Sequence, residues 1–282
     1  MATLAELQTM ATQVRRDILR MVYNVQSGHP GGSLGCADYF TAVFFHFMKH
    51  NPAAFDMQAR NQDAFFLSNG HISPAYYSVL ARSGYFPVPE LNTFRKLNSR
   101  LQGHPATHEG LPGIRVATGS LGQGLSVAAG MALQKKLDKD PHTIWVLTGD
   151  GELQEGQAWE AIMYAAHNKL DNMLVAVDFN KQQIDGSTVD IMGFSELGNK
   201  FASFGWEVVQ MDGNNMQEIL TVVPQAQARL GMGKPVVIIM KTEMGQGVDF
   251  MTGTHAWHGK APNAEQFDNA MAQLPVTELG DY

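Results

Sequence analysis

The chain has 282 residues, 44% of them hydrophobic and 17% charged, which is enough for one large domain or two modest ones. Its net charge of −7, with no cluster of lysine and arginine, weighs against a nucleic-acid partner. The single cysteine, Cys36, excludes an internal disulfide framework and fits a reducing compartment. Charged residues in the opening segment, among them Glu6 and Arg15, exclude a signal peptide and a membrane span, so we expect a cytoplasmic protein.

The first part of the chain combines helical periodicity with glycine-rich punctuation. The pattern predicts helices at 4–26, 36–50 and 74–81 and a strand at 64–67. A glycine-rich turn is expected after residue 26. Residues 84–115 are rich in Pro, Gly, His and Asn, so we expect a long loop region with a short helix near 89–97, as is typical of a functional site.

The second part alternates apolar strands with helices. Strands are predicted at 143–148, 173–179, 206–211 and 235–241, and helices at 124–137, 157–168 and 216–230. Strands joined through a right-handed helical crossover are parallel and usually neighbours. We therefore expect an α/β sandwich around a parallel sheet, and the lack of repeats or linkers indicates a single domain.

Polar residues follow two of these strands at the point where each ends. Gly149, Asp150 and Gly151 come after the strand at 143–148, and Asn180 follows the next strand. The carboxyl ends of parallel neighbours meet at one edge, so Asp150 and Asn180 should converge. Their oxygens suit Mg²⁺ or Ca²⁺, and the glycines let backbone amides approach a phosphate. The alternative is an ordinary tight turn with Asn180 as a cap, but the β-α-β context favours the cation site.

Four histidines lie in loops flanked by glycine or proline: His29, His71, His104 and His258. Any one alone could be a solvated surface residue, because loops tolerate polar side chains. Together they suit proton transfer near neutral pH and donation to phosphate or hydroxyl groups. A zinc site is the competing use, but no pair has close ligand spacing and Cys36 is isolated.

Two further segments lie at predicted helix starts. Residues 119–124, Gly-Ser-Leu-Gly-Gln-Gly, place free amides before an alanine-rich helix, which would suit a ligand or simply close helix packing. The acids Glu152, Glu155 and Glu160 lie at or near the start of the following helix, where acidic residues ordinarily complement the helix dipole.

In combination, these motifs resemble the thiamine-diphosphate enzymes, and specifically the N-terminal, diphosphate-binding (PP) part of transketolase. The resemblance runs from the first helix to WHGKAP through SGHPGGSLG, LSNGHISPAYY, GHP, TGSLGQGLSVAAGMA, GDGELQEGQAWEA and DFNKQQIDG, in family order. It implies a PP fold over 1–282, with a C-terminal extension from about residue 262.

The resemblance also implies roles for individual residues. Asp150 and Asn180 would bind the metal ion, Mg²⁺ or Ca²⁺, with the backbone carbonyl of Gln182. Residues that would contact thiamine diphosphate are His71, Gly119, Ser120, Leu121, Gly151 and His258. His29 and His104 would touch substrate hydroxyls and assist proton transfer, and Glu155 and Glu160 would form an acidic pair at a subunit interface.

Full transketolases continue into a pyrimidine-binding domain and a C-terminal domain, whereas this sequence stops at Tyr282. The resemblance therefore implies a partner subunit that supplies the pyrimidine-binding domain, in a heterotetramer with two copies of each chain. The implied reaction transfers a two-carbon glycolaldehyde unit from a ketose phosphate to an aldose phosphate, with pentose phosphates as the default sugars. The alternatives are a deoxyxylulose-phosphate-synthase-like subunit, an E1-type 2-oxoacid dehydrogenase component and a non-catalytic regulatory subunit.

Overall fold

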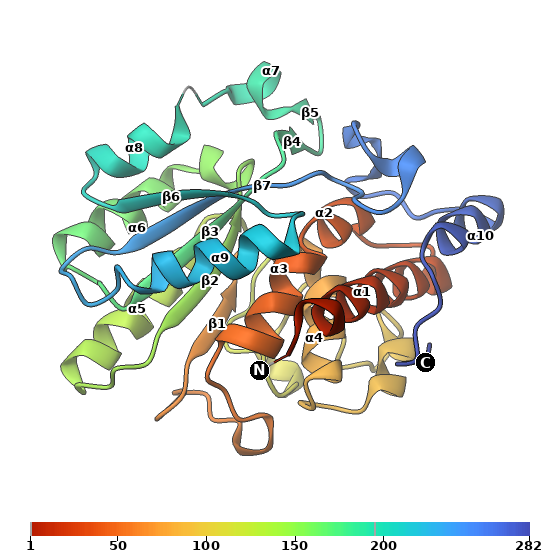
Figure 1. The fold of residues 1–282 in the computed structure, drawn as a ribbon, viewed down its shortest axis with the longest axis horizontal. Helices are drawn as coiled ribbons and strands as arrows, with labels where there is room; N and C mark the ends of the chain where they lie inside the picture. The colour runs from red at the N-terminus through yellow and green to blue at the C-terminus, as the bar shows by residue number, and fades with distance from the viewer. Residues whose placement is uncertain (1, 195) are drawn as a thin grey trace.

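The computed structural model describes residues 2–194 and 196–282, and its centre is a sheet of five parallel strands (Figure 1). The sheet has the order β1-β2-β3-β7-β6. Its strands are β1 (Ala64–Leu67), β2 (Ile144–Gly149), β3 (Met173–Phe179), β6 (Glu207–Asp212) and β7 (Val236–Lys241). The expected parallel α/β architecture is therefore confirmed, and β2 and β3 are direct neighbours.

Helices cover both faces of this sheet. One layer consists of α1 (Leu4–Val25), α3 (Ala37–Ala42), α4 (Ser73–Arg82) and α9 (Met216–Gln227). The other consists of α5 (Gln123–Leu137), α6 (Gly156–His167) and α8 (Leu197–Ser203). Because side chains alternate along a strand, Trp145 and Leu147 of β2 pack in the first layer and Ile144 and Val146 in the second. Both faces of β2 are therefore buried, which explains its continuous apolar run.

The segment after α1 is a short helix, α2 (Pro30–Gly35), where the sequence had suggested only a turn. Pro30 occupies the first helical position, where its fixed φ is favourable and its missing N–H costs nothing. The glycines allow close packing, since a Cβ on Gly31 would lie 2.5 Å from Cγ of Met244 and one on Gly35 would lie 2.8 Å from the Glu243 carbonyl oxygen. Tertiary packing thus makes a helix from a glycine-rich segment.

Several smaller elements complete the described part of the chain. They are a π-helical turn at Val43–Phe47, the hairpin β4 (Gln182–Gln183) and β5 (Gly186–Ser187), α7 (Thr188–Met192) and α10 (Ala264–Gln273). Short 3₁₀ turns lie at Pro52–Ala54, Gly70–Ile72, Val88–Thr93, Thr107–Glu109, Glu152–Gln154, Asp249–Met251 and His255–Trp257. No helix in the described ranges is both long and apolar enough to cross a membrane.

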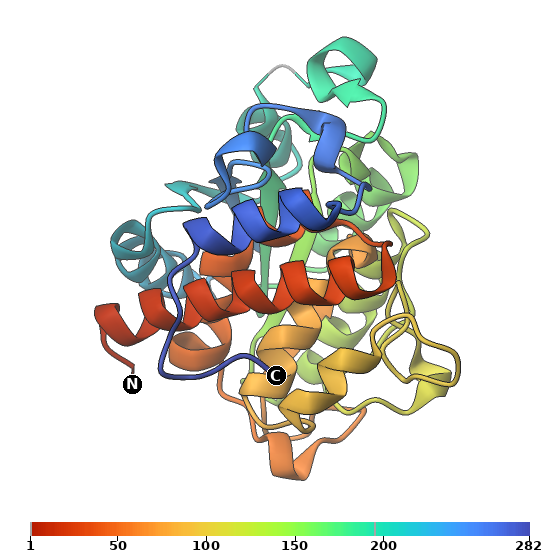
Figure 2. The same cartoon turned by 90° about the vertical axis from the view of Figure 1, so that its right-hand side faces the viewer.

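The end of the chain packs back onto its beginning. Figure 2 shows α10 alongside α1, and the last residues pass across the same helix. Arg16 of α1 donates from Nη2 to Oδ2 of Asp281 over 2.6 Å and from Nη1 to the Leu274 carbonyl oxygen over 2.6 Å. The guanidinium of Arg20 lies 4.9 Å from the ring centre of Tyr282. These contacts fix the C-terminal tail against the first helix.

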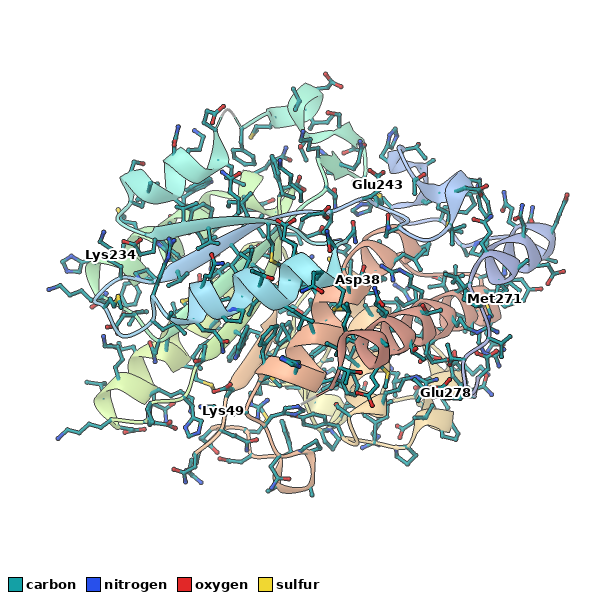
Figure 3. The ribbon with its side chains drawn as sticks, in the orientation of Figure 1. Asp38, Lys49, Lys234, Glu243, Met271 and Glu278 are labelled. Carbon is teal, nitrogen blue, oxygen red and sulfur yellow. The ribbon has the colours of Figure 1, made fainter. Side chains whose placement is uncertain are left out.

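All five strands point the same way, so their carboxyl ends form one edge of the sheet. Figure 3 labels Lys234 and Glu243, which flank β7 at its amino and carboxyl ends. Polar segments follow the strands at the carboxyl edge: 68–71 after β1, 150–151 after β2 and Asn180 after β3. Open parallel sheets bind ligands at this edge, so we expect the functional site among these loops.

Candidate functional site

A cavity of about 340 Å³ opens at the carboxyl edge of the sheet, a size suited to a cofactor. All but two of the residues to which the resemblance gives a role line it: His29, His71, His104, Gly119, Leu121, Asp150, Gly151, Glu155, Asn180, Gln182 and His258. Ser120 is exposed in the same loop as its lining neighbours, and Glu160 lies on the exposed side of α6. The fold thus gathers segments from most of the chain around one cavity.

Asp150 and Asn180 lie together because β2 and β3 are in register. Gly149 is opposite Asp178, and the Asp150 amide donates to the Asp178 carbonyl oxygen over 3.1 Å. Oδ2 of Asp150 then accepts from the Lys181 amide over 2.6 Å, and Oδ1 of Asn180 accepts from the Gln182 amide over 2.8 Å. The Asp150 carboxylate is thereby held directly beside the segment that carries Asn180 and the Gln182 carbonyl.

The burial of Asp150 close to a second carboxyl group, that of Asp178, favours a bound cation. Asp150 is only 1% exposed, and its burial together with the nearby carboxylate of Asp178 raises the pKa of Asp150 to about 8. Burial also raises the pKa of Asp178. Two buried carboxyl groups cannot easily both ionise, and a divalent cation would remove that penalty. A carboxylate, an amide oxygen and a carbonyl oxygen are the donor set that Mg²⁺ and Ca²⁺ prefer, so the residues present fit such an ion.

The protein offers only part of a coordination shell. Within the described ranges, no group of three or more His, Cys, Asp and Glu side chains is placed to hold a metal ion. A hard cation at Asp150 would therefore need carbonyl and amide oxygens, together with water or the oxygens of a bound anion.

The four loop histidines form one cluster centred on His29. Its ring centre lies 5.2 Å from that of His71, 5.9 Å from that of His104 and 5.6 Å from that of His258. Burial, then the nearby His258 and His104, lower the pKa of His29 to about 3, and burial lowers the pKa of His71 well below its usual range. These rings are neutral at pH 7, so each offers one donor and one acceptor to a ligand.

Several buried polar atoms in the cavity have no partner within the described part of the chain. They are both side-chain amide atoms of Asn69 and the Nδ1 atoms of His29 and His258. Leaving a buried donor or acceptor unpaired costs about 1–3 kcal/mol, so such atoms commonly mark a ligand site. Asn69 is 1% exposed and was not singled out from the sequence, although it follows β1 as Asp150 follows β2.

The loop before α5 approaches the histidine cluster with its backbone. Gly119 has φ +126°, and a Cβ there would lie 2.6 Å from Cδ2 of His104. The His104 ring therefore lies directly against the Gly119 backbone, an approach that only glycine permits. This contact connects the loop at 119–121 to the histidines across the mouth of the cavity.

Glu152 departs from the role expected of an acid at a helix start. Helix α6 begins only at Gly156, and Glu152 precedes it in a 3₁₀ turn, 2% exposed. Its carboxylate accepts hydrogen bonds from Ser68 after β1, from Thr148 in β2 and from Gly122 in the loop before α5. Glu155 and Glu160, by contrast, are exposed to solvent.

Comparisons with known proteins agree with this geometry. The family model described as "Transketolase, thiamine diphosphate binding domain" matches residues 7–277. The 6-deoxy-6-sulfo-D-fructose transketolase subunit SqwG of Clostridium sp. (strain MSTE9) is 39% identical over 95% of this chain and 96% of its own length. An apulose-4-phosphate transketolase subunit of Actinobacillus succinogenes is 37% identical, with coverage of 95% and 96%.

Longer transketolases contain a similar segment. The chain is 35% identical to human transketolase over 91% of its residues, but it spans only 40% of that protein. The crystal structure of transketolase from Campylobacter jejuni superposes with a TM-score of 0.88 at 35% identity, covering 97% of this chain and 43% of the other. The similarity thus includes the fold as well as the motifs.

Proposed function

Because this chain belongs to the transketolase family through its thiamine diphosphate-binding domain, we propose that it is the diphosphate-binding subunit of a two-chain transketolase. The assembled enzyme transfers a two-carbon glycolaldehyde unit from a ketose phosphate to an aldose phosphate. The observation that carries the proposal is the single cavity in which Asp150 and Asn180 adjoin a cluster of neutral histidines. Residues 1–282 act as one domain, with a C-terminal extension from about residue 262.

In this proposal, Asp150, Asn180 and the carbonyl oxygen of Gln182 bind Mg²⁺ or Ca²⁺. His71, His258 and the Gly151 backbone contact the diphosphate, and Gly119, Ser120 and Leu121 lie beside the aminopyrimidine. Two observations support this assignment. The Nδ1 atom of His258 has no partner in the described ranges and could donate to the diphosphate. The buried carboxyl groups of Asp150 and Asp178 lie close together, and a cation would offset their repulsion. Thiamine diphosphate supplies an electron sink for carbon–carbon bond cleavage.

His29 and His104 serve the sugar. Burial lowers the pKa of His29 to about 3, and partial burial also lowers the pKa of His104. Both shifts favour the neutral ring, in which one nitrogen accepts a hydroxyl proton and the other donates. His104 is exposed at the mouth of the cavity, where an arriving sugar would meet it first. His29 lies deeper, and its ring is surrounded by the rings of the other three loop histidines. Its Nδ1 atom has no partner in the described ranges. The pair orients the substrate hydroxyls and moves protons between them.

A second chain completes the active site. It supplies the pyrimidine-binding domain, and the two proteins assemble as a heterotetramer in the cytoplasm. The names of relatives of similar length, which call them subunits, support a partner. Glu155 and Glu160 lie at the interface, and α5 and α6 also expose the apolar side chains of Val127, Met163 and Tyr164.

The sugar specificity is proposed only by class. One relative is named for a sulfonated deoxyfructose and another for apulose 4-phosphate. We take pentose phosphates as the first donors to test and include a branched and a sulfonated ketose in the same panel. Each donor is paired with an aldose phosphate acceptor, so that transfer of two carbons is measured directly.

The decisive experiment reconstitutes the chain with the product of a neighbouring gene that encodes a pyrimidine-binding domain. The pair should transfer two-carbon units only with thiamine diphosphate and Mg²⁺. Asp150→Ala should abolish cofactor retention and activity, while Asp190→Ala, at an exposed position of α7, should preserve both. Carbon dioxide release from pyruvate would instead identify a 2-oxoacid enzyme, and a pair that binds no cofactor would identify a regulatory subunit.

A further inference from the structure

Glu152 is a buried carboxylate whose hydrogen-bond partners in the described ranges are all neutral. It is 2% exposed and opens the 3₁₀ turn between β2 and α6. Oε1 accepts from the Ser68 hydroxyl over 2.6 Å and from the Gly122 amide over 2.8 Å. Oε2 accepts from the Thr148 hydroxyl over 2.7 Å and from the Gly149 amide over 3.2 Å. A buried carboxyl group loses its contact with water, so its place in the fold depends on these four hydrogen bonds.

The four donors match the capacity of a carboxylate, which accepts two hydrogen bonds on each oxygen. They come from three separate segments: Ser68 follows β1, Thr148 and Gly149 end β2, and Gly122 precedes α5. The Ser68 hydroxyl oxygen in turn accepts from the Leu125 amide over 3.1 Å, in the first turn of α5. The carboxylate therefore holds α5 both directly and through Ser68.

Each of these segments leads into a different part of the cofactor site. Gly149 immediately precedes Asp150, and Gly122 immediately follows the loop at 119–121. Ser68 immediately precedes Asn69 and lies three residues before His71. One side chain thus fixes the spacing between the segment proposed to bind the metal ion and the segment proposed to lie beside the aminopyrimidine.

We propose that Glu152 is a positioning residue that couples the diphosphate-binding end of the site to its aminopyrimidine-binding end. The inference rests on the proposed function, since it concerns the same cofactor. Glu152 sets the relative placement of the Asp150 turn and the 119–121 loop, so that both ends of one ligand are bound at once. Its effect is on affinity for the whole cofactor, beyond any effect on folding.

Glu152→Gln tests this coupling with almost no change in shape. Whichever way the amide is oriented, its NH₂ group faces either the Gly122 amide or the Gly149 amide. The hydroxyls of Ser68 and Thr148 can rotate to accept from it, but a backbone N–H cannot. One of the two cofactor-site segments must therefore lose its anchor.

Asp63 provides a matched control at the opposite edge of the sheet. It is 4% exposed and accepts from the Thr143 amide over 2.9 Å, the Lys49 amide over 2.8 Å and Nε1 of Trp145 over 3.2 Å. It too is a buried carboxylate with neutral donors, but it lies where β1 and β2 begin. Asp63→Asn should therefore reduce stability as Glu152→Gln does, without reaching the cofactor site.

The experiment measures binding of Mg²⁺–thiamine diphosphate and of Mg²⁺–pyrophosphate to the reconstituted pair by calorimetry, with urea unfolding in parallel. Glu152→Gln should weaken thiamine diphosphate binding about tenfold or more, the effect of one lost buried anchor. It should also reduce the affinity advantage of thiamine diphosphate over pyrophosphate. Asp63→Asn should lower the unfolding midpoint and leave both affinities within about twofold, a difference too small to reflect a lost hydrogen bond.

Thr148→Val is the second variant, because it removes one donor to Oε2 and keeps the side-chain shape. It should shift thiamine diphosphate affinity in the same direction by a smaller factor. Unchanged affinity in Glu152→Gln, or in Thr148→Val if Glu152→Gln does not fold, would overturn the coupling role. If the unmodified pair fails to bind Mg²⁺–thiamine diphosphate, the proposed function itself fails and this inference with it.

Discussion

The side-chain amide of Asn180 donates to the buried carboxylate of Asp178 over 2.9 Å. Asp178 is 2% exposed and also accepts from the Thr242 hydroxyl, so it is fixed in place. Because Nδ2 of Asn180 is held by Asp178, Oδ1 is the atom that accepts from the Gln182 amide and is left to bind a cation. The orientation of a proposed metal ligand is thus set by a residue that the sequence motif did not identify.

Asp178→Asn should weaken Mg²⁺ binding, because an amide at this position can donate as well as accept and no longer selects one orientation of Asn180. Loss of such a supporting contact typically costs about 10- to 100-fold in metal affinity. The measurement is a Mg²⁺ titration of the reconstituted pair at saturating thiamine diphosphate. Asp63→Asn serves as the control, and equal Mg²⁺ affinity in the two variants would contradict the orienting role.

Gly119→Ala should damage the site through both backbone strain and a clash with His104. A non-glycine residue at φ +126° carries about 1–3 kcal/mol of strain, and the new Cβ would displace the His104 ring. We expect a higher KM for the ketose and a lower unfolding free energy. Gly110→Ala is the control, since Gly110 has φ +64° and open space around its Cβ position. If the two variants showed the same KM, His104 would not depend on Gly119.

Asp281→Asn should destabilise the protein at neutral pH and lose that effect in acid. The hydrogen bond from Arg16, then that from Gln13, holds the pKa of Asp281 at about 2, below the ordinary value near 3.9. A carboxyl group whose pKa is lowered by folding stabilises the fold when the pH is above its pKa in the unfolded chain. This contribution is lost as the pH falls from about 4 to about 2. Because the Asp281 side chain is one quarter exposed and solvent weakens the ion pair, we expect a loss of about 1–2 kcal/mol at pH 7.

Urea unfolding at pH 7 and at pH 3 checks this tail contact. The difference between Asp281→Asn and the unmodified chain should shrink at the lower pH. Asp268→Asn, at an exposed position of α10, should have no effect at either pH. A difference that stayed constant with pH would mean that packing, and not the Arg16 ion pair, holds the tail.

Met163→Lys should weaken assembly if α5 and α6 form the proposed interface. Met163 is 56% exposed beside Tyr164, and a charge placed in the apolar centre of an interface should reduce association about tenfold or more. Sedimentation velocity of the reconstituted complex gives the mass directly. Val276→Lys is the control, because Val276 is 79% exposed in the C-terminal tail. A full-sized complex with Met163→Lys would place the interface elsewhere.

The strands of the sheet and most of the longer helices could be predicted from the order of residues alone. The strands at Ala64–Leu67 and Met173–Phe179 have the predicted boundaries, because continuous apolar runs flanked by polar turns leave few alternatives. The residues with chemistry were also visible, since Asp150 and Asn180 follow strands that a crossover rule makes neighbours. These inferences depend only on local periodicity and on the right-handedness of crossover connections between parallel strands.

The pairing of polar atoms, in contrast, became visible only in the folded chain. Nothing local indicates that Glu152 joins Ser68 to Gly122, or that both amide atoms of Asn69 lack partners in the described ranges. The helix at Pro30–Gly35 likewise depends on close packing against the segment after β7. Hydrogen bonding and burial join residues far apart in the chain, and they follow from the paths of the loops, which local periodicity does not specify.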